Sequence, residues 1–187
     1  MLKVFIFSLL LTISLPIHAV GGWDPDEEEP KSTKATKSNS SRDVDNAIAK
    51  LKAKAPNLKR FFNKAYGYAI FPLVGKAGIG FGGAYGEGEV YRRGTYVGDT
   101  TLTQVSFGFQ LGGQSFIEII FFKDKAHYKD FIQGNFELGA QASAVALSAG
   151  ISADVDYDNG VAVFTLPKQG LMYEAVIAGQ KFSFDPK

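Results

Sequence analysis

Residues 76–92 read KAGIGFGGAYGEGEVYR, and this stretch carries the clearest indication of the fold. Its small side chains fall at every second position, at Gly78, Gly80, Gly82, Ala84, Gly86 and Gly88. Because side chains alternate between the two faces of a strand, this pattern predicts a β-strand with one nearly bare face. Glycine in a strand costs backbone entropy and usually marks a close approach by another segment. We expect this face to pack directly against the rest of the chain; the alternative is a slot for a flat or linear apolar ligand.

Further strands are predicted on both sides of this stretch. They follow from short apolar alternations at residues 66–71, 100–111, 115–122, 136–151, 161–166 and 171–184. The segment 136–151 is rich in alanine, so a helix is the alternative there. A turn at Gly112-Gly113-Gln114 is expected between two of them, and a short helix at 123–132. The 187 residues include 21 glycines and 16 phenylalanines. Together these features predict an α+β fold, with a mainly antiparallel, curved or barrel-like, glycine-rich β-sheet and a few packed helices.

The N-terminal residues 1–19 are typical of a secretory signal peptide. Lys3 precedes an apolar run at 4–15, and the small residue Ala19 follows it. A membrane-spanning helix needs about 20 apolar residues, so cleavage after Ala19 is expected, and a retained anchor is the alternative. The chain contains no cysteine, which excludes disulfides, thiolate metal sites and a lipid-modified cysteine. The sequence therefore predicts a periplasmic or secreted protein.

The mature chain is expected to hold a linker and a single domain. Residues 20–41 are polar and acidic at first, with frequent Pro, Ser and Thr, which predicts a disordered linker. The domain would span 42–187, with two basic helices at 42–64 before a β-rich core at 65–187. Seven basic and two acidic residues give the segment 42–64 a net charge of +5.

The first basic helix carries an apolar stripe, and the stripe has two possible uses. It consists of Val44, Ala47, Ile48 and Leu51, beside Lys50, Lys52 and Lys54. Such a helix can lie in a membrane interface with its lysines toward the lipid headgroups. Alternatively, the stripe packs on the sheet and the lysines are solvated.

No catalytic, metal or cofactor site is predicted. The sequence at 78–83 matches G-x-G-x-x-G, but the predicted strand continues through it where a nucleotide site needs a helix. His127 is the one histidine after the signal peptide and is interpreted as solvated. The alternating Asp154, Asp156 and Asp158 lack the glycine and glutamate of a calcium loop. A net charge of +1 gives no basic field for nucleic acid. These features do not predict an enzyme.

Four segments carry a resemblance to a known family. They read AYGYAIFPLVGKAGIGFGGAYGEG (65–88), TQVSFGFQLGGQSFIEIIFF (103–122), FIQGNFELGAQASAVA (131–146) and KQGLMYEAVIAGQKFSF (168–184). The sequence resembles the SYLF domain, and most closely its exported bacterial branch. This resemblance implies phospholipid or phosphoinositide binding through the domain and a preceding amphipathic helix, and actin binding in the eukaryotic members.

The residues and the resemblance together predict a non-enzymatic lipid-binding protein of the bacterial envelope, with an anionic phospholipid surface as its partner. The alternative is a structural or protein–protein interaction module without a lipid ligand. Candidate membrane contacts are Lys50, Lys52, Lys54, Lys59, Arg60, Lys76, Arg92 and Arg93. The candidate packing or ligand-slot glycines are Gly78, Gly80, Gly82, Gly86 and Gly88.

Overall fold

The computed structural model describes residues 33–138, 144–147 and 156–187, all within one compact unit, Ser32–Lys187. Its elements are α1 (Thr33–Lys54), a 3₁₀ turn η1 (Pro56–Leu58), α2 (Lys59–Lys64), β1 (Gly67–Arg92), β2 (Thr95–Phe122), α3 (Lys125–Ile132), β3 (Glu137–Leu138), β4 (Ala144–Ala146) and β5 (Val161–Pro186). The predicted signal peptide lies outside the described residues. Helix α1 begins at Thr33, so the expectation of a disordered linker was wrong for residues 33–41.

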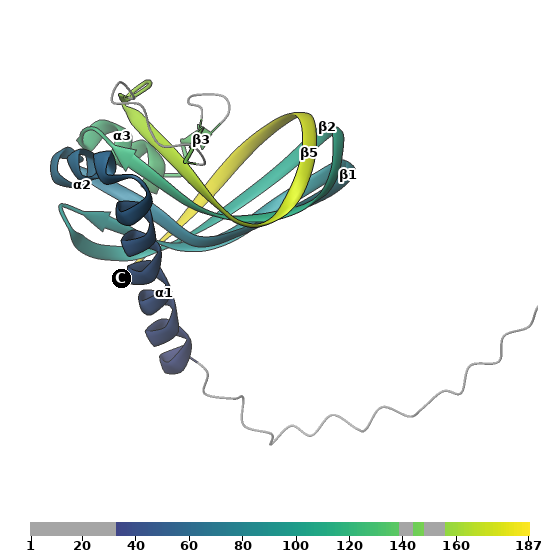
Figure 1. Cartoon of the computed structure of the whole chain (residues 1–187). Helices are drawn as coiled ribbons and strands as arrows, with labels where there is room; N and C mark the ends of the chain where they lie inside the picture. The colour runs from purple at the N-terminus through teal and green to yellow at the C-terminus, as the bar shows by residue number, and fades with distance from the viewer. Residues whose placement is uncertain (1–32, 139–143, 148–155) are drawn as a thin grey trace, which may run out of the picture. The chain divides into compact units, whose positions relative to one another are not determined.

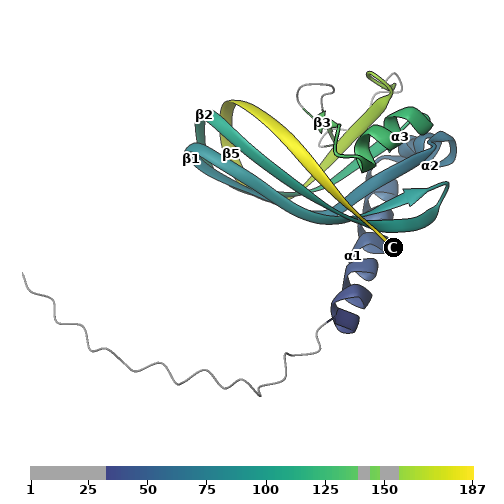
Figure 2. The same cartoon turned by 180° about the vertical axis from the view of Figure 1, so that it is seen from behind.

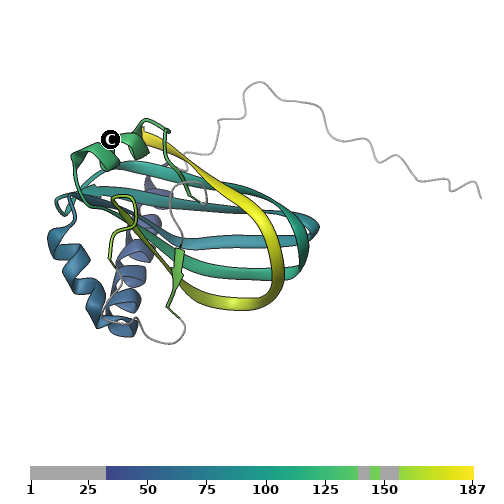
Figure 3. The same ribbon diagram turned by 90° about the horizontal axis from the view of Figure 1, so that it is seen from above.

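Three long strands form most of the sheet. Strand β2, of 28 residues, pairs antiparallel with β1 on one side and with β5 on the other. The order is β1-β2-β5-β3, and the short β4 pairs with β5. The three long strands curl over together at the end away from the helices (Figures 1 and 2), and the view from above shows the same curl (Figure 3). A mainly antiparallel, curved sheet with a few helices is thus confirmed, in the form of a curled half-barrel.

The three long strands are longer than the sequence predicted, whereas the strand predicted at 136–151 is represented in the described residues by the short β3 and β4. The expected turn at Gly112-Gly113-Gln114 is wrong, because β2 continues through it and pairs Gly112 with Gly78. Pro72, where the first predicted strand ends, is accommodated by a bulge between Phe71 and Val74. A second irregularity lies at Gly80, whose φ of +74° is in the left-handed region that favours glycine. The bulge at Pro72 therefore bends the strand where the sequence indicated an end, and the irregularity at Gly80 lies within a predicted strand.

Alternation along the strands sends side chains into two separate cores. The inner core fills the curl, and helix α3 packs into it; its large members include Phe71, Leu102, Phe122, Phe131 and Phe182. The outer core lies beneath α1 and α2 and joins Leu51 and Phe61 of these helices to Ile119, Phe121 and Phe164 of the sheet. The helices therefore cover the outer face of the sheet near the strand ends, and they leave the curled end uncovered (Figure 1).

Candidate functional site

The outer face of the curled end exposes large apolar side chains. We call residues 77–83 of β1 and 105–112 of β2 the apical bend. Phe81 of β1 is paired directly with Phe107 of β2, and these two side chains are 71% and 64% exposed. Ile79 is paired with Leu111 in the same way. The exposed set, which we call the apical surface, consists of Ile79, Phe81, Tyr85, Val105, Phe107 and Leu111.

The apical surface is free of charged residues on both of its described strands. Strand β1 has none between Lys76 and Glu87, and β2 has none between Asp99 and Glu118. A soluble monomer rarely leaves a contiguous apolar patch of this kind uncovered unless it binds something. The bend is therefore the best candidate for a contact surface in the described part of the chain.

A shallow, open hollow of about 750 Å³ accompanies the apical surface. Its lining is almost wholly apolar, with glycine and large side chains side by side: Ala77, Gly78, Ile79, Phe81, Gly82, Gly83, Leu111 and Gly112. Two of the candidate glycines, Gly78 and Gly82, thus border open space. Gly80 lies between them in sequence, and a Cβ added there would meet no atom within 4 Å.

The other two candidate glycines are enclosed. A Cβ added at Gly88 would overlap the carbonyl oxygen of Ile70, and one added at Gly86 would lie 2.9 Å from Val74. Both contacts come from the first part of β1, because the strand curls back over itself. The glycine face therefore has two parts: a closely packed one at residues 86–88 and an open one at residues 78–82.

The predicted basic contacts do not form one surface. Arg92 and Arg93 lie at the turn between β1 and β2, eleven and twelve residues beyond Phe81, or roughly 35 Å along a strand. Lys52 and Arg60 place their cationic groups over the rings of Phe62 and Phe61, at 4.6 and 4.9 Å from the ring centroids. Lys54 and Lys59 are exposed at the helical end, and Lys76 is half-buried beside the bend.

The apolar stripe of α1 packs on the sheet. Val44 and Leu51 are fully buried, and Ala47 nearly so, in the outer core. Ser41 at the same helix donates a hydrogen bond to Glu89 of β1, with an O···O distance of 3.1 Å. Of the two uses considered for the stripe, the structure therefore shows packing, and a helix lying with this stripe in a membrane is not the observed arrangement.

A small cleft lies between α1 and the sheet, and it brings together residues that the sequence does not connect. Its volume is about 170 Å³, and its lining comprises Asp43, Asn46, Ala47, Lys50, Pro72, Leu73, Ile117 and Lys168. Lys50 was a candidate contact, whereas Lys168 was not predicted. The Lys168 ammonium group lies 3.4 Å from the Pro72 carbonyl oxygen.

The curl also encloses a polar cluster without a cation. The side-chain NH₂ of Gln180 donates to Glu118 and to Gln104, each at 3.2 Å. Glu118 is completely buried, and this burial raises the pKa of its carboxyl to about 7, although the hydrogen bond from Gln180 opposes the rise. Within the described residues, Glu118 Oε1, Gln104 Nε2 and Gln180 Oε1 have no hydrogen-bond partner.

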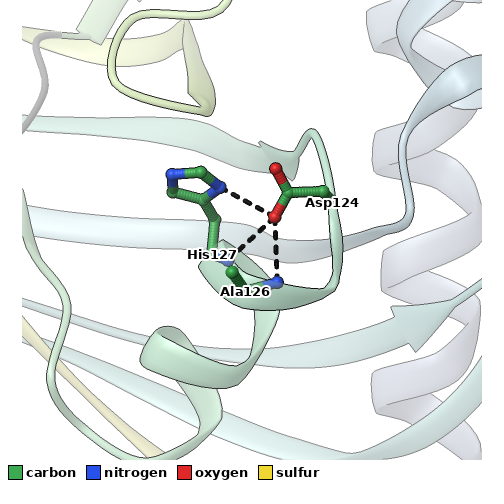
Figure 4. Close-up of polar contacts among 3 residues, drawn as sticks. All are labelled: Asp124, Ala126 and His127. Atoms are coloured by element: carbon green, nitrogen blue, oxygen red, sulfur yellow. Dashed lines mark hydrogen bonds and ion pairs between the residues drawn. The ribbon is translucent and has the colours of Figure 1, made fainter.

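His127 and Asp124 form a helix cap (Figure 4). The Asp124 carboxylate accepts hydrogen bonds from the backbone N–H groups of Ala126 and His127, and one of its oxygens lies 2.9 Å from His127 Nδ1. The backbone hydrogen bond from His127 lowers the pKa of this carboxyl. In the described residues there is no group of three or more His, Cys, Asp or Glu side chains that could hold a metal ion.

None of the helices in the described ranges combines the length and hydropathy required to span a bilayer. The described chain is thus a curled β-sheet domain with a helix-covered outer face at one end and a bare apolar bend at the other. Residues 103–187 match the family described as Las17-binding protein actin regulator, the Ysc84 or SYLF domain. The match runs from within β2 to the C-terminus and confirms the resemblance found in the sequence.

A curated relative extends the similarity toward the N-terminus. The chain is 29% identical over 160 residues to Beta cell expansion factor A of Aeromonas veronii. That alignment covers 83% of this chain and 60% of the relative, so the chain spans about 60% of the relative's length.

Proposed function

We propose that this protein is a non-enzymatic lipid-binding protein of the bacterial envelope, and that it contacts membranes through the apical surface. The observation that carries the proposal is the exposed Phe81–Phe107 pair in a bend without charged side chains. Transfer of apolar side chains from water to an apolar environment is favourable. The hydrocarbon boundary of a bilayer provides such an environment without requiring a charged or hydrogen-bonding partner. The family match agrees with lipid binding, which the resemblance implies.

The proposed surface changes the role of the basic helices. The α1 stripe is already buried, so the apolar contact falls to the apical bend and the helices contribute charge alone. Lysines near an anionic surface contribute about 1 kcal/mol each, and this contribution weakens with salt. The apolar contribution persists at high salt. Binding should therefore consist of a salt-sensitive and a salt-resistant part.

Vesicle co-sedimentation of a Phe81→Ser/Phe107→Ser variant tests the proposal. Full burial of a Phe side chain contributes about 1.5–3 kcal/mol, and the exposed two-thirds of two such side chains therefore about 2–4 kcal/mol. Affinity for anionic vesicles should fall by on the order of a hundredfold. Since both side chains are exposed, circular dichroism and thermal stability should stay close to those of the wild type.

A pair of charge insertions provides the matched comparison. Phe81→Asp places a carboxylate in the apical surface, and Thr95→Asp places the same charge at the exposed far end of β2. We expect the first to abolish vesicle binding and the second to leave it near the wild-type level. Equal binding by both variants and the wild type would refute the apical surface as the contact.

The envelope location is proposed from residues 1–19 alone. Export with cleavage after Ala19 gives a mature chain that begins at Val20. Intact mass spectrometry of the exported protein tests this location, and a mass that includes Met1 would refute the cleavage.

A protein–protein interaction module is the second candidate, and the exposed edge of β1 favours it. Strand β1, of 26 residues, is the last strand on its side of the sheet in the described residues. An extended segment of a partner can add to such an edge through backbone hydrogen bonds. Binding of that kind would survive Phe81→Asp, which separates the two candidates.

A further inference from the structure

The cleft between α1 and the sheet is formed by two bulges that flank the same part of β2. On one side, Pro72 and Leu73 of β1 lie opposite the single residue Ile117. On the other side, Ser115 and Phe116 of β2 each pair with a residue of β5. Lys168 is the one extra residue of β5 that lies between these two pairs. Bulges redirect side chains and often accompany functional sites. Here they bring Lys168 to the same cleft as Lys50 of α1.

The charges in the cleft are of both signs. On α1, Asp43, Asn46 and Lys50 are three and four residues apart, which places them along one side of the helix. Lys50 and Lys168 supply ammonium groups, Asp43 supplies a carboxylate and Asn46 an amide. Neither lysine forms an ion pair with a carboxylate in the described part of the chain. Two cations beside one anion suit a ligand whose own negative and positive groups are adjacent.

We propose that this cleft binds the headgroup of a phospholipid whose phosphate is followed by a group with N–H donors, as in phosphoethanolamine. Lys50 and Lys168 bind the phosphate, and Asp43 accepts a hydrogen bond from the ammonium group. The cleft volume of about 170 Å³ equals that of five or six water molecules at about 30 Å³ each, which is adequate for a group of this size. A phosphocholine headgroup has no N–H donor for Asp43. Inorganic phosphate has no cationic group at all, so it places only negative charge near the Asp43 carboxylate.

The position of the cleft agrees with the apical surface as the membrane contact, and the inference rests on that proposed function. Leu73 borders the cleft, and the exposed, uncharged Gly75, Ala77 and Ile79 follow it at alternate positions along the outer face of β1. The six residue steps from Leu73 to Ile79 span roughly 20 Å of strand. One leaflet of the hydrocarbon core is about 15 Å thick. A headgroup in the cleft can therefore direct its acyl chains along this row toward the bend.

Soluble probes test the headgroup site without a membrane. We would titrate the full chain with O-phosphoethanolamine, phosphocholine and inorganic phosphate and follow binding by NMR or calorimetry. Phosphoethanolamine should bind most tightly of the three. Lys50→Gln and Lys168→Gln should each weaken its binding about fivefold, by the contribution of one lysine near an anion. Lys129→Gln on α3 removes the same charge outside the cleft and should change nothing.

The Asp43→Asn variant tests selectivity rather than affinity. The variant should bind phosphoethanolamine and phosphocholine with the same affinity. Phosphoethanolamine loses its hydrogen bond to the carboxylate, and phosphocholine makes none in the wild type either. The lipid test compares vesicles of phosphatidylethanolamine and phosphatidylglycerol with vesicles of phosphatidylcholine and phosphatidylglycerol. Wild-type protein should prefer the vesicles that contain phosphatidylethanolamine, and Asp43→Asn should remove that preference. Equal affinity of the wild type for the three soluble probes, or unchanged binding by Lys168→Gln, would overturn the inference.

Failure of this site and failure of the proposed function give different results. Vesicle binding that depends on Phe81 and Phe107 but shows no headgroup preference would overturn the headgroup site and leave the apical contact in place. Binding of phosphoethanolamine by a protein that binds no vesicles would overturn the lipid assignment and indicate a site for a free phosphate ester. The Phe81→Ser/Phe107→Ser variant should lose vesicle binding and keep its affinity for the soluble probe.

Discussion

Replacing the buried Glu118 by Gln should change how the stability of the protein depends on pH. The folded protein holds the proton of Glu118 more tightly than the unfolded chain, because burial raises the pKa of this carboxyl from 4.5 to about 7. Its contribution to stability is therefore fully present below pH 4.5 and is lost as the pH rises through about 7. The difference of two to three pKa units corresponds to about 3 kcal/mol of folding free energy. Gln keeps the shape and an oxygen acceptor for Gln180, and it cannot ionise.

Urea unfolding of wild type and Glu118→Gln between pH 5 and pH 9 measures this effect. The difference in free energy of unfolding between the two proteins isolates Glu118, since all other titrating groups are shared. It should shift in favour of the variant by about 2–3 kcal/mol over this range, mostly between pH 5 and pH 8. Glu87→Gln, which removes the same charge from the exposed outer face, is the control. A difference curve that stays level from pH 5 to pH 9 would refute the reasoning.

Three further predictions concern packing and capping. Gly88→Ala should destabilise the protein by about 1–3 kcal/mol, because its Cβ overlaps the Ile70 carbonyl, whereas Gly75→Ala meets open space and should be nearly neutral in the same thermal melts. Leu51→Ala removes a fully buried side chain of the outer core and should cost about 2–5 kcal/mol in urea unfolding, with unchanged vesicle affinity for the molecules that remain folded. Asp124→Ala removes the cap of α3 and should cost about 1 kcal/mol at neutral pH; unaltered stability would show that the cap contributes nothing.

Element types were predictable from the sequence, but strand lengths were not. The alternation of small and large residues around Phe81 indicated a strand, and the described structure has a strand there. Pro72 and Gly112 were interpreted as strand ends because both are common in turns. In the structure a bulge accommodates Pro72, and Gly112 continues in β2 with a φ of +123°. A local signal cannot separate a bend within a strand from a break between two strands, since both use the same residues.

The candidate site was predictable only in part, for a topological reason. Lys50 and Lys168 are 118 positions apart in the chain, and they meet because α1 packs over the sheet at the bulges. No short pattern encodes that meeting. The buried Glu118 did leave a signal, because it stands between Phe116 and Ile120 on the alternation that fills the inner core. A charged residue in an apolar alternation marks an unusual interior group, and this signal was available in the sequence.

The position of β5 has a consequence for the order in which the chain can fold. Strand β2 pairs on one side with β1, which precedes it across a tight turn, and on the other side with the C-terminal β5. Gly98 pairs with Pro186, so this second edge closes only when residues 88 positions apart meet. Contacts at such separation form slowly, and an open strand edge of 28 residues invites pairing with other chains in the meantime. A chain that stops before residue 161 should therefore form the β1–β2 hairpin and aggregate along β2, because its last 27 residues protect that edge during folding as much as they complete the sheet.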